Sequence, residues 1–256
     1  MLLADLTGAA VEFTRENQLN YVADLGGLQI FEPPLIGVAD AADPLFASLK
    51  EAVAVGPHHL LPTEWLSTAR SVIAYFLPFT PAVRQANRGQ GDPATEWLYG
   101  RIEGQVFNNA LSRHLVDLLT AVGYAAVAPA QDARFAVSER RSNWSERHVA
   151  YIAGLGTLSL NCSIITAKGA AGRLGSIITD LDLEPTARPY SETHEYCSHC
   201  GACIRRCPPQ AIDENGKSHP VCSDYLDGIM ARFRPRYGCG KCQTGVPCEE
   251  RIPARR

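Results

Sequence analysis

The sequence predicts an α/β domain followed by a small cysteine-rich module. Strand-like and helix-like segments alternate through about the first 185 residues, which is typical of an α/β fold. Eight of the nine cysteines lie between residues 197 and 248. Residues 185–191 resemble a linker between these two regions. We therefore expect an α/β cofactor and substrate domain over residues 1–188 and a separate module over residues 189–256.

Apolar runs and helix-start residues define the elements expected in the first domain. We expect short strands at residues 35–39, 71–77, 124–128, 163–166 and 174–179. The second of these is apolar almost throughout, as in strands covered on both faces. Helices are expected at residues 8–17, 43–53, 111–122 and 146–153. Residues 80–97 are rich in Pro, Gly, Asn and Gln and are expected to form a long, functional loop.

The composition is that of an ordinary soluble protein. The chain has 256 residues, of which 46% are hydrophobic and 20% charged, with a formal net charge of −3. We find no signal-peptide pattern and no run approaching the ~20 apolar residues of a membrane helix. We therefore expect a cytoplasmic protein with no membrane contact. The basic residues after Arg232 are interpreted as a solvated tail, with a nucleic-acid patch as the alternative.

The cysteines give the most specific motif in the chain. The run Cys197-x2-Cys200-x2-Cys203-x3-Cys207-Pro208 is the ligand pattern of a bacterial-type ferredoxin, whose fourth cysteine ligates a second 4Fe-4S cluster. The motif therefore predicts a ferredoxin-like module with two 4Fe-4S clusters and requires four more ligands downstream. We assign Cys197, Cys200, Cys203 and Cys248 to the first cluster, and Cys207, Cys222, Cys239 and Cys242 to the second.

Two readings compete with parts of this assignment. Two structural zinc sites are the alternative to clusters, but zinc favours pairs of cysteines over three within seven residues. Cys162 is left over in an apolar stretch, and we expect it to be a buried structural thiol. The tryptophans are expected to pack in the core or at its rim.

Three segments outside the cysteine run point to a family. They are Leu61 to Ile73 (LPTEWLSTARSVI), Glu146 to Gly156 (ERHVAYIAGLG) and Gly172 to Ser176 (GRLGS). Together with the two-cluster module they resemble the epoxyqueuosine reductases and, more distantly, the reductive dehalogenases. The resemblance implies a nitroreductase-like, cobalamin-binding α/β domain. It also implies cofactor contacts at Gly154, Leu155, Gly156, Gly172, Gly175 and Ser176, with a helix C-cap at Gly154 and a tight turn at Gly172 as the alternatives.

The sequence departs from this family at two places. Epoxyqueuosine reductases have an Asp-Ser-x-Pro-x-x-Glu segment whose Asp is the proposed proton donor, and alignment on Glu146 puts Arg140 at the Asp position. The chain also stops soon after its last cysteine, so we expect a short paralogue without the tRNA-contacting extension and do not expect tRNA as a partner. For the missing acid we predict His148 or Tyr151 as proton donor. Weaker candidates are Glu139 and Asp132; Ser142, Ser145 and Glu146 are interpreted mainly as a helix cap.

These observations predict a cobalamin-dependent iron–sulfur reductase. We expect electrons to pass from two 4Fe-4S clusters to a bound cobalamin and to reduce a small substrate or a corrinoid-protein partner. The electron donor is expected to be a ferredoxin, a flavodoxin or a reductase. Two alternatives stay open: a ferredoxin-like electron carrier that docks a partner enzyme, and a protein that reactivates the corrinoid of another enzyme.

Overall fold

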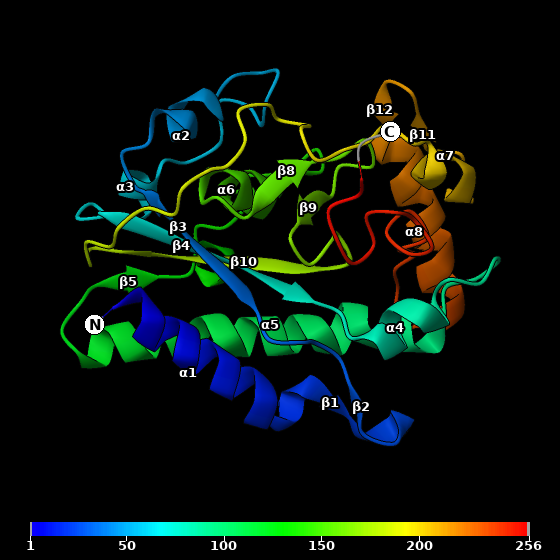
Figure 1. Cartoon of the computed structure of the whole chain (residues 1–256), viewed down its shortest axis with the longest axis horizontal. Helices are drawn as coiled ribbons and strands as arrows, with labels where there is room; N and C mark the ends of the chain where they lie inside the picture. Colours follow the sequence, from blue (N-terminus) through cyan, green and yellow to red (C-terminus); the bar gives the residue numbers. More distant parts are fainter. Residues whose placement is uncertain (1, 255–256) are drawn as a thin grey trace.

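A four-stranded sheet forms the centre of the computed structural model, which describes residues 2–254 (Figure 1). Its strands lie in the order β3-β4-β10-β5 and pair antiparallel throughout. Their bounds are β3 (Leu35–Asp40), β4 (Ser71–Pro78), β10 (Gly172–Thr179) and β5 (Ala126–Val127). The mixed α/β character predicted from the sequence is confirmed. Alternating elements often give a parallel sheet, but the pairing here is antiparallel.

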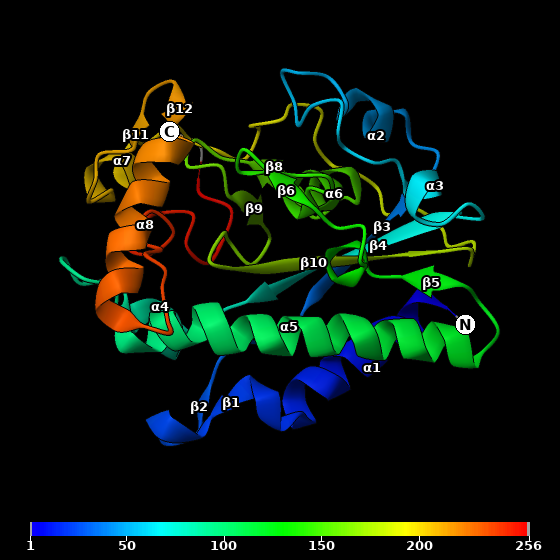
Figure 2. The ribbon, with the colours of Figure 1, turned by 180° about the vertical axis from the view of Figure 1, so that it is seen from behind.

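Helices cover both faces of this sheet. The long helix α5 (Thr95–Ala121) lies along one face, with α1 (Leu3–Glu16) packed outside it (Figures 1 and 2). Helix α6 (Glu146–Ile152) packs on the other face, together with α2 (Pro44–Ser48) and α3 (Pro62–Trp65). All eight residues of β4 are buried, as expected for a strand covered on both sides. One apolar core therefore lies on each face.

Short hairpins and turns complete the first 180 residues. The pairs are β1 (Tyr21–Val22) with β2 (Leu28–Gln29), β6 (Val137–Ser138) with β7 (Arg141–Ser142), and β8 (Gly156–Leu158) with β9 (Ile164–Thr166). Three 3-10 turns are η1 (Gln18–Asn20), η2 (Ala23–Leu25) and η3 (Pro129–Gln131).

The segment predicted as a long loop, residues 80–97, is partly helical. Helix α4 (Pro81–Ala86) occupies its first part, and α5 already begins at Thr95. Pro81 stands in the first turn of α4, where a proline favours a helix start. The prediction therefore failed because its proline was taken as a loop residue. Helix α5 was also predicted too short, because polar residues interrupt the apolar repeat in its first half.

The cysteine-rich segment stands at one end of the sheet (Figures 1 and 2). Its elements are α7 (Ala202–Arg206), β11 (Ile212–Asp213), β12 (Gly216–Lys217) and α8 (His219–Phe233). The peptide N–H of Leu158 donates to Thr193 O at 2.8 Å, and Asn161 Nδ2 donates to Cys242 O at 2.6 Å. The chain before residue 188 and the chain after it are thus hydrogen-bonded together, and a domain boundary there stays a prediction.

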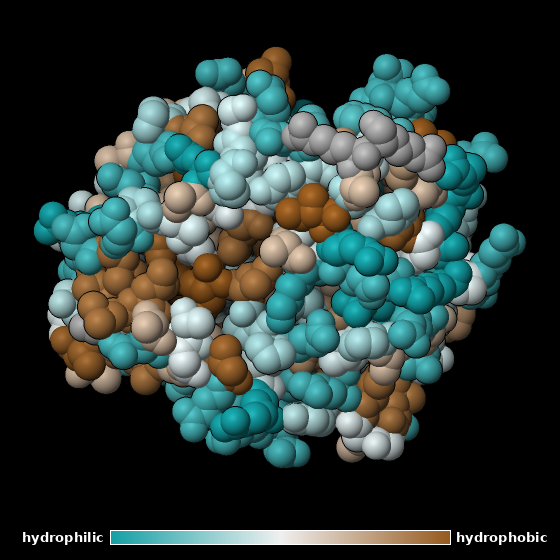
Figure 3. All heavy atoms as spheres, in the orientation of Figure 1, coloured by the Kyte–Doolittle hydropathy of each residue, from teal (hydrophilic) through white to brown (hydrophobic). Residues whose placement is uncertain are grey.

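The surface differs between the two ends of the molecule. On the face in Figure 3, apolar residues gather over the end with the sheet and α1, and hydrophilic residues cover most of the end with α4 and the cysteine-rich segment. Among residues 2–254, no helix is both long enough and apolar enough to span a bilayer.

Candidate cofactor cavity and cysteine groups

Eight cysteines come together in two groups of four. Cys197, Cys200, Cys203 and Cys248 line one small cavity, and Cys207, Cys222, Cys239 and Cys242 line part of a second, much larger one. The pKa of Cys248 is raised to about 12, mainly by burial. The other thiols of its group also raise it, by smaller amounts. Burial likewise raises the pKa of Cys242 to about 12, and the neighbours that add to this shift are the other thiols of the second group. This is the grouping expected from the sequence.

The local chain geometry explains how the first run of cysteines reaches both groups. Gly201 has a positive φ of 67° and starts helix α7, so Cys200 and Cys203 lie on either side of a sharp change of direction. Cys207 follows the last residue of α7, and Pro208 prevents the helix from continuing. The first three cysteines therefore share one cavity, and Cys207 is directed to the other.

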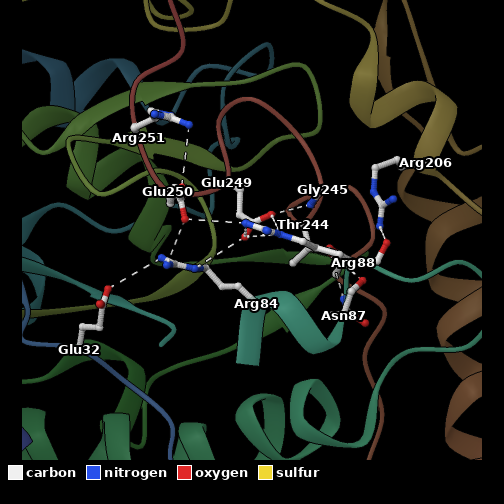
Figure 4. A network of polar contacts seen from close by, with 11 residues as sticks. Glu32, Arg84, Asn87, Arg88, Arg206, Thr244, Gly245, Glu249, Glu250 and Arg251 are labelled. Atoms are coloured by element: carbon white, nitrogen blue, oxygen red, sulfur yellow. Dashed lines mark hydrogen bonds and ion pairs between the residues drawn. The ribbon is translucent and has the colours of Figure 1, made fainter. Parts of the chain in front are cut away.

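A polar network attaches the last cysteines to helix α4 (Figure 4). The Glu249 carboxylate is 3% exposed and accepts hydrogen bonds from Arg88 at 2.8–3.1 Å. Arg84 lies 3.7 Å from the same carboxylate, and Gly245 N donates to it at 2.6 Å. Asn87 Nδ2 donates to Cys239 O at 2.9 Å. These contacts hold the backbone on both sides of Cys248 and the turn at Cys239 against α4.

The large cavity has a volume of about 940 Å³ and lies between the sheet, α5 and the cysteine-rich segment. Its walls include β10, the first half of α5 and the second cysteine group. Trp97 of α5 packs against Gly240, where a Cβ atom would lie 1.9 Å from the indole ring. The volume is at the upper end of the ~300–1,000 Å³ typical of ligand pockets.

Glu146 is the one acidic residue among the described residues that line this cavity. Both its carboxyl oxygens are buried, and within residues 2–254 the Ser176 hydroxyl is close to them but forms no hydrogen bond of good geometry with either. Burial raises its pKa to about 7, and the nearby Ser176 hydroxyl moderates the increase. A carboxyl group with this pKa is partly protonated at neutral pH and can deliver a proton to a bound molecule.

Tyr75 and Ser176 surround this carboxyl group. The Tyr75 hydroxyl donates to Asn108 O at 3.1 Å. Burial is the main cause that raises the pKa of this phenol, and the Glu146 charge raises it further. Trp144 Nε1 donates to Ser176 Oγ at 2.9 Å. Gly175 pairs with Tyr75 across the sheet, and a Cβ atom there would lie 2.2 Å from the Tyr75 hydroxyl. The glycine leaves room for the phenol beside the cavity.

The structure separates the predicted cofactor contacts into two sets. Gly172, Gly175 and Ser176 of β10 line the large cavity. Gly154, Leu155 and Gly156 are not among its lining residues. Gly154 has a φ of 82° just after α6, the helix-end conformation considered as its alternative, and Gly156 packs closely on β9. Of the two predicted sets of cofactor contacts, the β10 segment alone is in place to contact a ligand in this cavity.

The two predicted proton donors also lie away from the large cavity. His148 Nδ1 is 2.7 Å from Ser145 Oγ, and burial lowers its pKa to about 4, so the ring is neutral at pH 7. The Tyr151 hydroxyl donates to Ser191 O at 3.3 Å. Neither residue lines the cavity, so their role as proton donors stays a prediction. Glu146, interpreted from the sequence as a cap residue, does line it, because the first turn of α6 faces the cavity.

The weaker donor candidates Asp132 and Glu139, and Arg140 at the position of the missing acid, lie outside the cavity lining. Asp132 pairs with Arg134 at 2.7 Å, and this contact lowers the pKa of Asp132 to about 2. Glu139 and Arg140 form the turn between β6 and β7, both with positive φ. Arg140 lies 3.9 Å from Asp224 of α8. None of these three residues lines the cavity.

A polar stripe on α5 was missed by the sequence analysis. Arg101, Gln105, Asn108 and Ser112 all line the cavity. Their spacing of four, three and four residues places them on one helix face, beside an apolar face that contains Leu111 and Leu115. A search for polar repeats as well as apolar ones identifies this stripe in the sequence. Trp97 also lines the cavity, whereas Trp65 and Trp144 belong to the core.

Comparison with known proteins places this geometry in context. No family model matches the chain. It is 29% identical over 195 residues to the epoxyqueuosine reductase of Staphylococcus aureus, covering 71% of this chain and 49% of that protein. It is 31% identical over 102 residues to the trichloroethene reductive dehalogenase of Dehalococcoides mccartyi, covering 38% of this chain and 18% of that protein. The matches thus span about half or less of these relatives.

Solved structures share the fold at lower identity. The epoxyqueuosine reductase of Bacillus subtilis aligns with a TM-score of 0.53 and 18% identity over 98% of this chain and 67% of that one. A reductive dehalogenase whose structure suggested a mechanism for B12-dependent dehalogenation aligns with a TM-score of 0.59 and 15% identity, over 86% of this chain and 30% of that one. The chain is thus similar in sequence to epoxyqueuosine reductases and a reductive dehalogenase, and it shares the fold of their solved structures.

Proposed function

We propose that this protein is an iron–sulfur reductase that uses a corrinoid to reduce a small molecule in the large cavity. The main support is the position of the second cysteine group, which forms part of the wall of the same cavity that contains Glu146. A redox centre and a proton donor would then serve one ligand site.

The cysteine groups fit 4Fe-4S clusters better than single metal ions. Each group offers four thiols at one cavity. Among residues 2–254, however, no three Cys, His, Asp or Glu side chains converge tightly enough to bind one ion. A zinc ion needs four sulfurs at ~2.3 Å, whereas a cubane spreads its four ligands over four irons. Clusters bound here would supply electrons singly.

The large cavity has features that suit a corrinoid. Buried polar atoms on its wall have no hydrogen bond of good geometry within the described chain, namely Asn108 Oδ1, Arg173 Nε and both Glu146 carboxyl oxygens. Buried polar atoms normally form hydrogen bonds, so a ligand with amide and other polar groups fits this wall. A corrinoid bound here would supply a reducible cobalt. We propose Gly172, Gly175, Ser176 and Asn108 as its contacts.

The chain's own residues would then bind the substrate and manage protons. The pKa of Glu146, raised by burial, keeps a proton available near pH 7 at a site enclosed by Phe76 and Tyr75. The Ser176 hydroxyl beside this carboxyl group is itself held by a 2.9 Å hydrogen bond from Trp144 Nε1. A plain electron carrier is the less favoured alternative, because it has no use for an enclosed carboxylic acid in a large cavity.

Metal analysis and an anaerobic titration test this proposal. Reconstituted protein should contain about eight iron atoms per chain. Cys200→Ser should lose the first cluster and retain the second, and Cys242→Ser should do the reverse. Added cobalamin should bind one per chain with a shifted visible spectrum. Zinc in place of iron would overturn the cluster assignment, and an unchanged cobalamin spectrum would overturn the corrinoid assignment.

A further inference from the structure

Two half-buried arginines face the large cavity without an acidic partner. Arg101 of α5 and Arg173 of β10 both line it. Arg173 donates to the main-chain carbonyl of Arg101, and its Nε is buried with no partner in the described chain. Arg101 Nη2 donates to the Tyr237 hydroxyl at 2.9 Å. Neither guanidinium forms an ion pair within residues 2–254. Arg84, Arg88 and Arg236, in contrast, each pair with a glutamate.

The free-energy cost of burying two arginine side chains side by side points to a negatively charged ligand. Burial lowers the pKa of Arg173 to about 9, and the Arg101 charge adds to the decrease, so the surroundings disfavour the cation. Burying a charge without a counter-charge is expensive, and two like charges together increase the cost. A negatively charged ligand between the two guanidiniums would offset it, because Arg forms strong paired hydrogen bonds to phosphate and carboxylate.

The other charges on the cavity wall have their own partners or lie apart. Lys217 is next to the thiols of Cys222 and Cys242, which raise its pKa against the effect of burial. The charges that act on Arg173 come from Arg101 and Tyr237, and no thiol is among them. Arg147 is exposed, and Glu146, the acidic lining residue, is not among the charges acting on Arg173.

We propose that Arg101 and Arg173 form an anion subsite that binds a phosphate or carboxylate group of the molecule in the large cavity. This proposal rests on the proposed function for the identity of the larger ligand, but the subsite itself depends only on the two arginines. Two sources of the anion are chemically equivalent at this site. One is the phosphodiester in the nucleotide tail of cobalamin, and the other is an acidic group on the substrate.

Three anaerobic measurements on the cluster-loaded full chain test the subsite. The first is binding of inorganic phosphate without corrinoid, against chloride at equal ionic strength. The second compares cobalamin with cobinamide, which lacks the phosphodiester tail. The third is phosphate binding to cobalamin-loaded protein. Each is made for the wild type, Arg173→Gln, Arg101→Gln and, as control, Arg113→Gln. Arg113 is an exposed residue of the same helix whose partner is Gln131.

The expected result is that wild type binds phosphate and that Arg173→Gln or Arg101→Gln weakens this binding about tenfold or more, with no change in Arg113→Gln. If both variants weaken cobalamin but not cobinamide, the anion is the cofactor's phosphodiester. If both corrinoids bind unchanged and the variants lose phosphate from cobalamin-loaded protein, the anion belongs to the substrate. Arg101→Gln gives the answer if Arg173→Gln does not fold.

Equal binding of phosphate and of both corrinoids by the wild type and both variants would overturn the subsite. Failure of the proposed function is a different outcome. In that case neither corrinoid binds to the wild type, while phosphate binding that depends on Arg173 can still be observed.

Discussion

Glu146 is the single residue on which the proposed chemistry depends most. Its carboxyl group is buried, without a hydrogen bond of good geometry within the described chain, and beside the β10 segment that lines the cavity. Glu146 stands in the first turn of α6, as interpreted from the sequence, but Ser145 at the N-cap position forms no side-chain cap hydrogen bond. The sequence alone did not reveal that the same turn faces a cavity, because burial of a polar group depends on elements distant in sequence.

Replacing Glu146 by Gln should change how stability depends on pH. The folded protein holds a proton on Glu146 up to about pH 7, whereas the unfolded chain loses it near 4.5. Stability from this group is therefore complete below about pH 4.5 and is lost as pH rises through about 7, by at most ~3 kcal/mol. Glu146→Gln should be more stable than the wild type at pH 8 and lack this part of the pH dependence.

Anaerobic thermal unfolding between pH 5.5 and 8.5 measures this difference. Glu12→Gln, a change of an exposed residue in α1, is the matched control and should follow the wild-type curve. Parallel curves for Glu146→Gln and the wild type would contradict the raised pKa. If activity is found, its rate in the wild type should fall above pH 7 as the acid loses its proton.

At the scale of elements, β10 and its neighbour β4 determine the cavity wall. The sequence predicted both strands and the burial of β4, because apolar runs bounded by Pro and Gly report strand position directly. The close fit of Tyr75 over Gly175 was not predictable, because cross-strand register is not encoded in either segment alone. The start of α5 was missed for a related reason: its cavity-facing stripe is polar.

Gly175→Ala should destabilise the protein by about 1–3 kcal/mol, because the added methyl group overlaps the buried Tyr75 ring. The matched control is Gly8→Ala in α1, where nothing lies within 4 Å of the new Cβ atom. That change should be neutral or stabilise by about 0.5–1 kcal/mol, through helix propensity. Unfolding midpoints of both variants measure the contrast, and an equal effect of the two would show that the β10–β4 fit is not close.

The link between α4 and the cysteine-rich segment gives a second prediction for elements. Glu249→Ala removes the buried carboxylate shared by Arg84 and Arg88 (Figure 4). It leaves the nearly buried Arg84 with the partly exposed carboxylates of Glu32 and Glu250. We expect a loss of roughly 2–4 kcal/mol, below the full value for a buried pair because Arg88 is 44% exposed. Iron should also be released faster to a chelator, since Cys248 precedes Glu249.

Glu16→Ala is the control for this prediction, because it removes the same charge from an exposed side chain at the end of α1 whose ion-pair partner is the exposed Arg15. It should change stability by less than about 1 kcal/mol and leave iron release unaltered. Equal iron release by Glu249→Ala and the wild type would contradict a role for the network in holding the first cysteine group.

At the scale of the whole molecule, the fold brings the second cysteine group to the wall of the large cavity. The cysteine spacing was sufficient to predict two groups of four, because ligand order follows directly from the chain path around a cluster. It could not predict that only the second group reaches the large cavity, or that Arg101 and Arg173 meet there. Those contacts form between segments more than 60 residues apart, which no local pattern records.

The central claim is that the second cysteine group supplies electrons to a corrinoid in the cavity. Anaerobic electron paramagnetic resonance of cobalamin-loaded, partly reduced protein tests it most directly. The cobalt signal should be broadened by coupling to the neighbouring cluster in the wild type and in Cys200→Ser, and should be narrow in Cys242→Ser. A bound cobalamin whose signal is narrow and identical in all three proteins would contradict the claim.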